Sequence, residues 1–481
     1  MKLNRIAICV LAAISSQAYA LTPAEIADNG TVKVYMSGAS ALRNIIGGLF
    51  TQNCTTDLSE YRSAIGTFSG TAFASVGDAH RVYACTMRAT SPILPGKKVA
   101  LFKSDVGGSG QGVFPVYFGA VAPFPARNFL ATTVAGCTAR VATVPNYTCT
   151  GETAQVPMVG ISDVEPSLFT GINVPGDDPS YPSTGLSETQ LSDLTITPLF
   201  QTVFAVAVNK SLRDAMQTRQ SLVAGSELEV DRPSISRIEA AAYFGGFLQG
   251  PGTGLGWQPI VSDTDAKRAT RVNICRRVNG SGTQAAANAF LTQFPCNTVS
   301  GLFPVDYGSS SVVAPNAISS VGPTTPGGNG LFVFEGSTTG NVISCLNQAE
   351  TSGAYAIGHV SRENAEPTTA TWRHVRLDGV TPGRDNVKNG KYEYFFESTI
   401  QWHKTKFLTL SADQQEFLTA FSVQAQKPSS LTLLAAANQN GVAALPDSYA
   451  GAFGSGTAQE QLFGSRVTRG GLSCTAPFHT K

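Results

Sequence analysis

Four turns rich in glycine and serine each follow a predicted strand, and this repeated junction limits the folds that the chain can adopt. The turns span residues 37–41, 104–112, 160–166 and 277–283. Three of them also precede a predicted helix, so strands and helices alternate along the sequence. Such alternation predicts an α/β fold with mostly parallel sheets.

The predicted strands are short runs of β-branched and aromatic residues. They cover residues 31–36, 98–103, 203–208, 331–334 and 354–360. Helices are predicted at residues 41–50, 283–294 and 411–424. The first helix has apolar residues at helical spacing, the second is rich in alanine, and the third starts with a serine cap. Two polar segments rich in Gly and Pro, 174–185 and 319–330, predict surface loops, and residues 122–157 look like an insertion.

The first 20 residues have the order of a secretory signal. Lys2 and Arg5 precede an apolar run, and Ala18-Tyr19-Ala20 fits cleavage before Leu21. The alternative is a buried N-terminal helix. The residue after the cleavage site is Leu rather than Cys, so no lipid anchor is indicated. No later run reaches about 18 apolar residues, so no membrane-spanning helix is predicted. We therefore expect a soluble mature protein that is periplasmic or secreted.

Composition excludes several classes of protein. Of the 481 residues, 42% are hydrophobic and 14% are charged, which excludes disorder driven by charge. The net charge of +1 becomes −1 once Lys2 and Arg5 are removed, and no basic run occurs, which argues against nucleic-acid or anionic-membrane partners. The histidines are scattered and no C-x-x-C occurs, so we expect no metal site and no cofactor.

An even number of cysteines remains after signal removal, because Cys9 lies within the signal. The eight are Cys54, Cys85, Cys137, Cys149, Cys275, Cys296, Cys345 and Cys474. In an exported chain such a set predicts disulfides, although the sequence does not determine their connectivity. Our hypothesis is pairing between nearest neighbours, with Cys137–Cys149 and Cys54–Cys85 as the first two bridges.

The first two turns each allow a ligand site or an ordinary turn. At residues 37–41 the start of a helix offers free backbone N–H groups beside serine hydroxyls, which suits an anion; the alternative is that Ser40 only caps the helix. The turn at 104–112 has four glycines that let a ligand approach the backbone, or it is simply flexible. It lacks the G-K-[ST] of a P-loop.

The other two turns carry charged residues. Ser162 and Glu165 have the spacing of a capping box, which would make this turn a helix start. The alternative is that Asp163 is a buried hydrogen-bond acceptor for a ligand. In the turn at 277–283, Arg277 supplies a guanidinium, and Ser281, Thr283 and a helix N-terminus add further donors. This combination of donors favours a site for an oxyanion over an ordinary cap.

These motifs resemble the type 2 periplasmic solute-binding proteins, in particular the phosphate-binding component of bacterial ABC importers and its secreted relatives. The run R-x-x-G-S-G-T at Arg277 has the family's ligand motif with its spacing intact. Weaker landmarks follow the family's order over about residues 30–425: S-G-A-S-A at Ser37, G-G-S-G-Q-G at Gly107, S-D at Ser162, F-A-V-A-V-N at Phe204, A-I-G-H-V at Ala356 and L-D-G-V-x-P at Leu377.

The resemblance implies two α/β lobes that close on an oxyanion, most simply phosphate. Lobe one would comprise residues 21–202 and 362–481, and lobe two residues 203–361. The implied ligand-binding residues are Ser40, Ala41, Leu42, Ser109, Gly110, Asp163, Arg277, Ser281, Gly282 and Thr283. The family usually has a Thr-aromatic pair where this chain has Ala41 and Leu42. An ABC permease would be the partner of a monomeric binding protein.

Two other classes of function stay open. A secreted hydrolase would need a nucleophile elbow, G-x-S-x-G, and neither Ser109 nor Ser281 lies in one, so we do not expect an enzyme. An extracellular interaction protein could keep the two-lobed fold without a phosphate ligand, and the departure at Ala41 and Leu42 favours that alternative.

Overall fold

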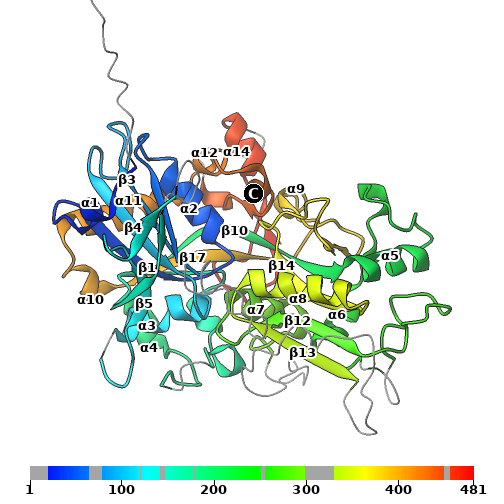
Figure 1. The fold of residues 1–481 in the computed structure, drawn as a ribbon. Helices are drawn as coiled ribbons and strands as arrows, with labels where there is room; N and C mark the ends of the chain where they lie inside the picture. Colours follow the sequence, from blue (N-terminus) through cyan, green and yellow to red (C-terminus); the bar gives the residue numbers. More distant parts are fainter. Residues whose placement is uncertain are drawn as a thin grey trace, which may run out of the picture.

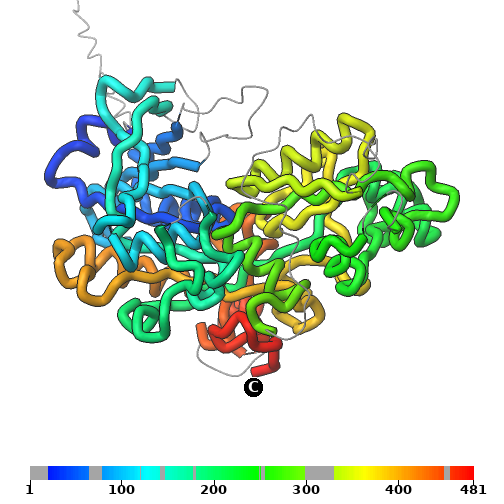
Figure 2. The backbone as a smooth tube through the Cα atoms, turned by 90° about the horizontal axis from the view of Figure 1, so that it is seen from below, coloured from blue at the N-terminus to red at the C-terminus, as the bar shows by residue number. Residues whose placement is uncertain are grey.

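The computed structural model describes residues 20–63, 79–119, 121–140, 147–176, 180–248, 250, 255–297, 330–448 and 455–480. The predicted signal segment, apart from Ala20, and the predicted loop 319–330, apart from Gly330, lie outside the described residues. The chain forms two lobes that lie side by side (Figures 1 and 2). The first lobe is drawn mainly in blue, cyan and orange, the second in green and yellow.

The first lobe is built on a sheet whose central strands run parallel. Its strands, in spatial order, are β9 (Val159–Ser162), β1 (Val32–Gly38), β4 (Lys98–Ser104), β3 (His80–Thr86), β2 (Ser59–Ser63), β7 (Tyr147–Cys149) and β6 (Cys137–Ala139). Strand β1 is parallel to both β4 and β9, and β3 is antiparallel to its neighbours. Apolar side chains of α2 (Arg43–Thr51) and α11 (Ala412–Gln426) pack together in the core beside this sheet, because burial of an apolar face stabilises an amphipathic helix.

The second lobe repeats this plan on a smaller scale. Strand β12 (Val272–Arg277) lies between β13 (Leu331–Gly336) and β14 (Ala356–Ser361) and is parallel to both. Helix α8 (Thr339–Thr351) buries Val342 and Leu346 against the sheet. Helices α5 (Lys210–Arg219), α6 (Arg237–Phe244) and α7 (Gly282–Ala287) complete the lobe, and a π-helix, Asn288–Thr292, continues α7.

One long strand joins the two lobes. Strand β10 (Leu194–Asn209) pairs antiparallel with β17 (Phe395–His403) at its start and with β14 and β15 (Trp372–His374) at its end. The sheet therefore continues from one lobe into the other. Strand β15, which lies beyond position 361, pairs with the end of β10 that also pairs with β14. The predicted two-lobed α/β fold is confirmed.

Shorter elements complete the lobes. They are α1 (Pro23–Ala27), α3 (Phe114–Phe118), α4 (Glu188–Ser192), β11 (Ser234–Ile235), β16 (Arg376–Leu377), α9 (Arg384–Lys388), α10 (Lys404–Phe407), α12 (Pro428–Leu431), α13 (Ala436–Asn440), β18 (Val442–Ala443), α14 (Ala458–Phe463), β19 (Val467–Thr468) and β20 (Phe478–His479). Within the predicted insertion, β5 (Arg127–Ala131) pairs with β8 (Gly151–Gln155). No helix of the described part of the chain has the length and apolar character needed to cross a membrane.

Four disulfides join the eight cysteines. The predicted bridges Cys54–Cys85 and Cys137–Cys149 are confirmed. Nearest-neighbour pairing is wrong for the other four cysteines, which form Cys275–Cys345 and Cys296–Cys474. The physical reason is packing: Cys275 lies on β12 directly beneath α8, which carries Cys345, so the two are neighbours in space although 70 residues separate them in sequence.

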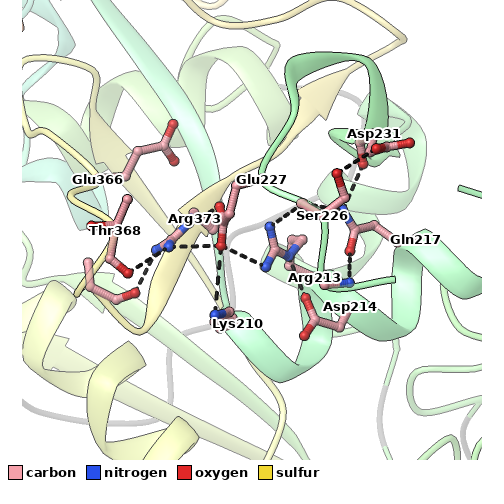
Figure 3. A network of polar contacts seen from close by, with 12 residues as sticks. Lys210, Arg213, Asp214, Gln217, Ser226, Glu227, Asp231, Glu366, Thr368 and Arg373 are labelled. Carbon is pink, nitrogen blue, oxygen red and sulfur yellow. Dashed lines mark hydrogen bonds and ion pairs between the residues drawn. The ribbon is translucent and has the colours of Figure 1, made fainter. Parts of the chain in front are cut away.

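A network of ion pairs on the second lobe joins α5 and the segment after it to β15 (Figure 3). Glu227 contacts Arg373 at 2.8 Å and Arg213 at 3.1 Å, and Arg213 also donates to the carbonyl of Ser226. The hydrogen bond from Arg373 is the largest influence that holds the pKa of Glu227 at about 2. These contacts hold the segment after α5 against β15. The charged side chains of Arg213, Glu227 and Arg373 therefore have a structural role.

Two local predictions of helix caps are wrong. Helix α2 begins at Arg43, and its cap residue, Leu42, makes no side-chain hydrogen bond, so Ser40 does not cap it. Strand β9 ends at Ser162, and Glu165 accepts a hydrogen bond from the backbone N–H of Ser473, so no capping box forms. The predicted cap of α11 is confirmed, since Ser411 accepts from Gln414.

Candidate functional site

The predicted ligand residues come together between the lobes. Because β9, β1 and β4 are parallel neighbours, the turns after them lie at the same edge of the first lobe's sheet. The turn after β12 meets them from the second lobe, through the contacts given below. We call the set Ser40, Ser109, Asp163, Arg277 and Thr283 the interlobe site. All five side chains are buried.

Arg277, at the end of β12, provides the site's buried cation. Its Nη1 donates to Ser40 Oγ of the first lobe at 2.7 Å, while Nε and Nη2 donate to the carbonyls of Gly336 and Ser337. Burial lowers the pKa of Arg277 to about 10, so the guanidinium stays charged at neutral pH. Ser40 thus serves as a partner of Arg277 across the lobes, which is why the cap prediction fails.

Asp163, directly after β9, provides a buried acceptor. Its Oδ2 accepts from Thr283 Oγ1 at 2.8 Å, and its backbone N–H donates to Ser109 Oγ at 3.1 Å. Its Oδ1 has no hydrogen-bond partner among the described residues. Burial raises the pKa of Asp163 to about 6, with Thr283 and Arg277 opposing the rise. An unpartnered buried oxygen of this kind indicates a missing donor.

Glycines let the two lobes approach closely here. A Cβ at Gly282 would lie 2.3 Å from Ser109 Oγ, and one at Gly108, whose φ is +77°, would lie 2.7 Å from the Cα of Ser281. The backbone N–H of Gly110 donates to the carbonyl of Gly280 at 2.7 Å. The glycine-rich turns are therefore required by contact between the lobes, in addition to any approach of a ligand.

Backbone N–H groups add donors at the same place. Helix α7 begins at Gly282, so the N–H groups of Gly282 and Thr283 belong to its first turn, where the helix itself offers no acceptor. Ser281 caps this helix by accepting from Gln284. Ala41 and Leu42 follow Ser40 in the turn before α2 and are buried; only their position next to Ser40 places them at the site.

Several buried charged residues beside the site were not predicted from the sequence. Lys103, at the end of β4, pairs with Asp105, which also pairs with Arg43 on α2. Burial acts to raise the pKa of Asp105, but Lys103 and Arg43 outweigh it and hold that pKa below its usual value. Charged residues on both sides of Ser104, at the end of an otherwise apolar strand, were the signal that could have revealed them.

Glu363 is a further buried carboxyl group, two residues after β14. Its Oε2 lacks a hydrogen-bond partner among the described residues. Burial raises the pKa of Glu363 well above its usual value, and Arg43 only partly opposes this. The uncharged form is therefore favoured. No pattern in the sequence marked this residue, because its place depends on how the chain returns from the second lobe.

The described parts of the predicted surface loop 174–185, residues 174–176 and 180–185, are partly buried. Tyr181 is buried, stacks on Phe114 and donates to Gln111 Oε1. Pro175 lies against both Gly110 and Gly280, close enough that a Cβ at either glycine would meet its ring at 2.7 Å. The segment therefore covers one side of the interlobe site. No cluster of His, Cys, Asp and Glu that could hold a metal occurs among the residues that the structure describes.

Comparison with known proteins finds matches among solved structures only. No family model and no curated protein sequence matches the chain. The structure is similar to a phosphate ABC transporter substrate-binding protein from Clostridium perfringens, with 11% identity over 86% of this chain and 99% of that chain and a TM-score of 0.41. It is also similar to an ABC-type phosphate transport receptor from Vibrio cholerae, with 12% identity, coverage of 84% and 96%, and a TM-score of 0.38.

A third similar structure is a phosphate-binding protein from Stenotrophomonas maltophilia, at 13% identity over 81% of this chain and 83% of that chain, with a TM-score of 0.38. These proteins are of the kind that the sequence motifs resemble. The likenesses are distant, with TM-scores below 0.5, and we therefore derive the function from this chain's own residues.

Proposed function

We propose that this chain is an exported solute-binding protein that holds a tetrahedral oxyanion, with inorganic phosphate preferred, at the interlobe site. One observation carries the proposal: the interlobe site buries both a cationic donor and an anionic acceptor. The donor is the guanidinium of Arg277, and the acceptor is the unpartnered carboxylate oxygen of Asp163. An ABC permease as partner, and a periplasmic or secreted location, follow as part of the same proposal.

The donors around Arg277 suit an oxyanion. A buried anion loses its hydration and must recover it from fixed donors, and charge-assisted hydrogen bonds from a guanidinium are the strongest of these. The Ser40 hydroxyl, which accepts from Arg277 and keeps its own proton, and the backbone N–H groups in the first turn of α7 add neutral donors. When the anion binds, it replaces some of the direct hydrogen bonds between the lobes, such as the one between Arg277 and Ser40. Each of these residues then contacts the anion instead.

The balance of buried charge also favours an anion. Lys103 and Arg277 contribute two buried cations, and Arg43, with 12% of its side chain exposed, adds a third beside Asp105. Asp105 and, above a pH of about 6, Asp163 contribute two carboxylates, whereas burial favours the uncharged form of Glu363. The excess of positive charge is compensated when an anion binds, because an unpaired buried charge is costly.

Asp163 accounts for the preference for phosphate. Monohydrogen phosphate still carries a proton and can donate a hydrogen bond to the free oxygen of Asp163. Sulfate has no such proton and would face a buried like charge. A lost bond of this kind, with a buried group left unsatisfied, costs a few kcal/mol, on the order of a hundredfold in affinity.

The preference for phosphate over sulfate should depend on pH. Because burial raises the pKa of Asp163 to about 6, the side chain is a carboxylate at pH 8 and increasingly protonated below pH 6, where it can donate to sulfate. A bound anion raises this pKa further. We expect the ratio of sulfate to phosphate dissociation constants to shrink at least tenfold from pH 8 to pH 5. A ratio that is constant over this range would contradict the role of Asp163.

Thermal denaturation of the mature chain, residues 21–481, tests the proposal as a whole. Phosphate at a hundredfold excess over its dissociation constant should stabilise the folded state by about 2.7 kcal/mol and raise the melting temperature by a few degrees. Sulfate at pH 8 should leave it unchanged. Hydrolysis of phosphate or acyl esters under the same conditions would indicate an enzyme and contradict the proposal.

A second candidate function has one observation in its favour. The lobes already contact each other through Arg277 with Ser40 and Gly110 with Gly280, and Pro175 lies against both of these glycines. A protein whose lobes stay closed would serve as a rigid extracellular interaction module without a ligand. Such a protein would show no thermal stabilisation by any oxyanion, which distinguishes it from the solute-binding protein.

A further inference from the structure

A buried row of side-chain amides leads from Arg277 in the second lobe to the first lobe. Gln284 Oε1 accepts from the backbone N–H of Arg277 at 3.3 Å, and Gln284 Nε2 donates to Asn288 Oδ1 at 2.8 Å. Asn288 Nδ2 donates to Asn173 Oδ1 at 2.7 Å, and Asn173 Nδ2 donates to the carbonyl of Leu168 at 2.9 Å. The row crosses between lobes at the Asn288–Asn173 contact.

His359 fixes the direction of this row. Its Nε2 lies 2.9 Å from Gln284 Oε1, and its Nδ1 has no partner among the described residues. Burial lowers the pKa of His359 to about 3, so the ring is neutral. Gln284 Oε1 already accepts from the backbone N–H of Arg277, so a hydrogen bond with His359 requires the ring proton to be on Nε2. That oxygen must then be an acceptor, which leaves Gln284 Nε2 to donate toward Asn288.

The row runs beside the interlobe site along the same two segments. Asp163 and Asn173 lie at the two ends of one first-lobe segment, and Thr283 and Asn288 lie on the helix that faces it. The bond Thr283–Asp163 joins the segments at the site, and Asn288–Asn173 joins them at the other end. Both asparagines are buried, with 1% of Asn173 and 3% of Asn288 exposed.

Separating the lobes at this point would leave two buried polar atoms, Asn288 Nδ2 and Asn173 Oδ1, without partners until water reached them. An unsatisfied buried polar group costs about as much as several ordinary hydrogen bonds contribute. The arrangement therefore resists opening in the absence of a ligand. Because Gln284 also holds the backbone of Arg277, a change in the row is transmitted to the cation of the site.

We propose that the side-chain row Gln284–Asn288–Asn173 is an interlobe latch that stabilises the closed form and positions Arg277, and that Asn288 and Asn173 are positioning residues. The proposal concerns the same site as the proposed function and rests on it only for its effect on affinity. Its effect on the shape of the free protein does not depend on any ligand.

The variants N173A and N288A test the latch, because they remove the same bond from opposite lobes. For each we expect a larger radius of gyration of the ligand-free protein in X-ray scattering, and a phosphate dissociation constant raised roughly 5- to 30-fold. The double variant should differ little from either single variant, since the shared contact is already lost. Should one variant fail to fold, the other still provides the test.

N273A is the matched control. Asn273 is equally buried, and its amide donates to the carbonyl of Tyr355 within the second lobe at 2.7 Å. It should lower the melting temperature without changing the radius of gyration, and change the dissociation constant less than about twofold. The latch is overturned if N173A and N288A behave like N273A in scattering. If scattering changes as expected but no phosphate binds to the unmutated chain, the proposed function fails and the latch stands.

Discussion

Replacing Arg277 with alanine should abolish tight phosphate binding. The guanidinium is buried, donates across the lobes to Ser40 and keeps its charge. Truncation of one member of a buried, hydrogen-bonded charge pair costs about 2 to 5 kcal/mol, which corresponds to a rise of roughly 30- to 5,000-fold in the dissociation constant. Calorimetric titration of the variant measures this loss directly.

The neighbouring residue provides the control for this prediction. Arg276 precedes Arg277 on β12 and is buried too, but its guanidinium pairs with Glu335 on β13. Because successive side chains of a strand point to opposite faces, Arg276→Ala should cost stability and leave phosphate affinity within about threefold. Equal losses of affinity in the two variants would show that the effect of Arg277→Ala is general unfolding rather than the loss of a ligand contact.

Replacing Asp163 with asparagine should let sulfate bind. The amide keeps an oxygen that can accept from Thr283 and gains an N–H donor where Asp163 has its unpartnered oxygen. Removal of the buried like charge should improve sulfate affinity at pH 8 on the order of a hundredfold, with a smaller loss for phosphate. Competition of the two anions for the variant gives both dissociation constants in one experiment.

Glu165→Gln is the matched control for Asp163→Asn. Glu165 lies two residues further along the chain, is partly buried, and contacts Ser473 rather than the site. Burial raises its pKa as well, so the control removes a similar carboxyl group outside the site. It should leave sulfate excluded. Sulfate binding by Glu165→Gln, or its continued exclusion by Asp163→Asn, would contradict the selectivity mechanism.

Most of the strands and turns that form the two-lobed fold could be predicted from the sequence. Strands β1, β4, β13 and β14 lie where β-branched and aromatic runs predicted them, and the predicted run 203–208 falls within the end of β10, since a buried strand leaves a local apolar signature. The turns after β1, β4, β9 and β12 were recognisable because glycine and serine recur there, together with an arginine in the last of them. The site residues could therefore be predicted from segments far apart in the chain.

What the sequence could not provide are contacts that depend on three-dimensional packing. Ser40 has the position of a helix cap, yet its hydroxyl accepts from Arg277, which only the approach of the second lobe makes available. The bridge Cys275–Cys345 requires α8 to lie over β12. Likewise the bond between Asn288 and Asn173 forms only where the two lobes meet, and no local spacing in the sequence predicts it.

Calorimetric titration of the mature chain, refolded free of any carried-over ligand, tests the central claim most directly. Phosphate at pH 8 should bind with a stoichiometry of one to one, and sulfate under the same conditions should give no heat. Absence of heat and of thermal stabilisation with either anion would contradict the assignment of the interlobe site to phosphate and would favour the closed interaction module.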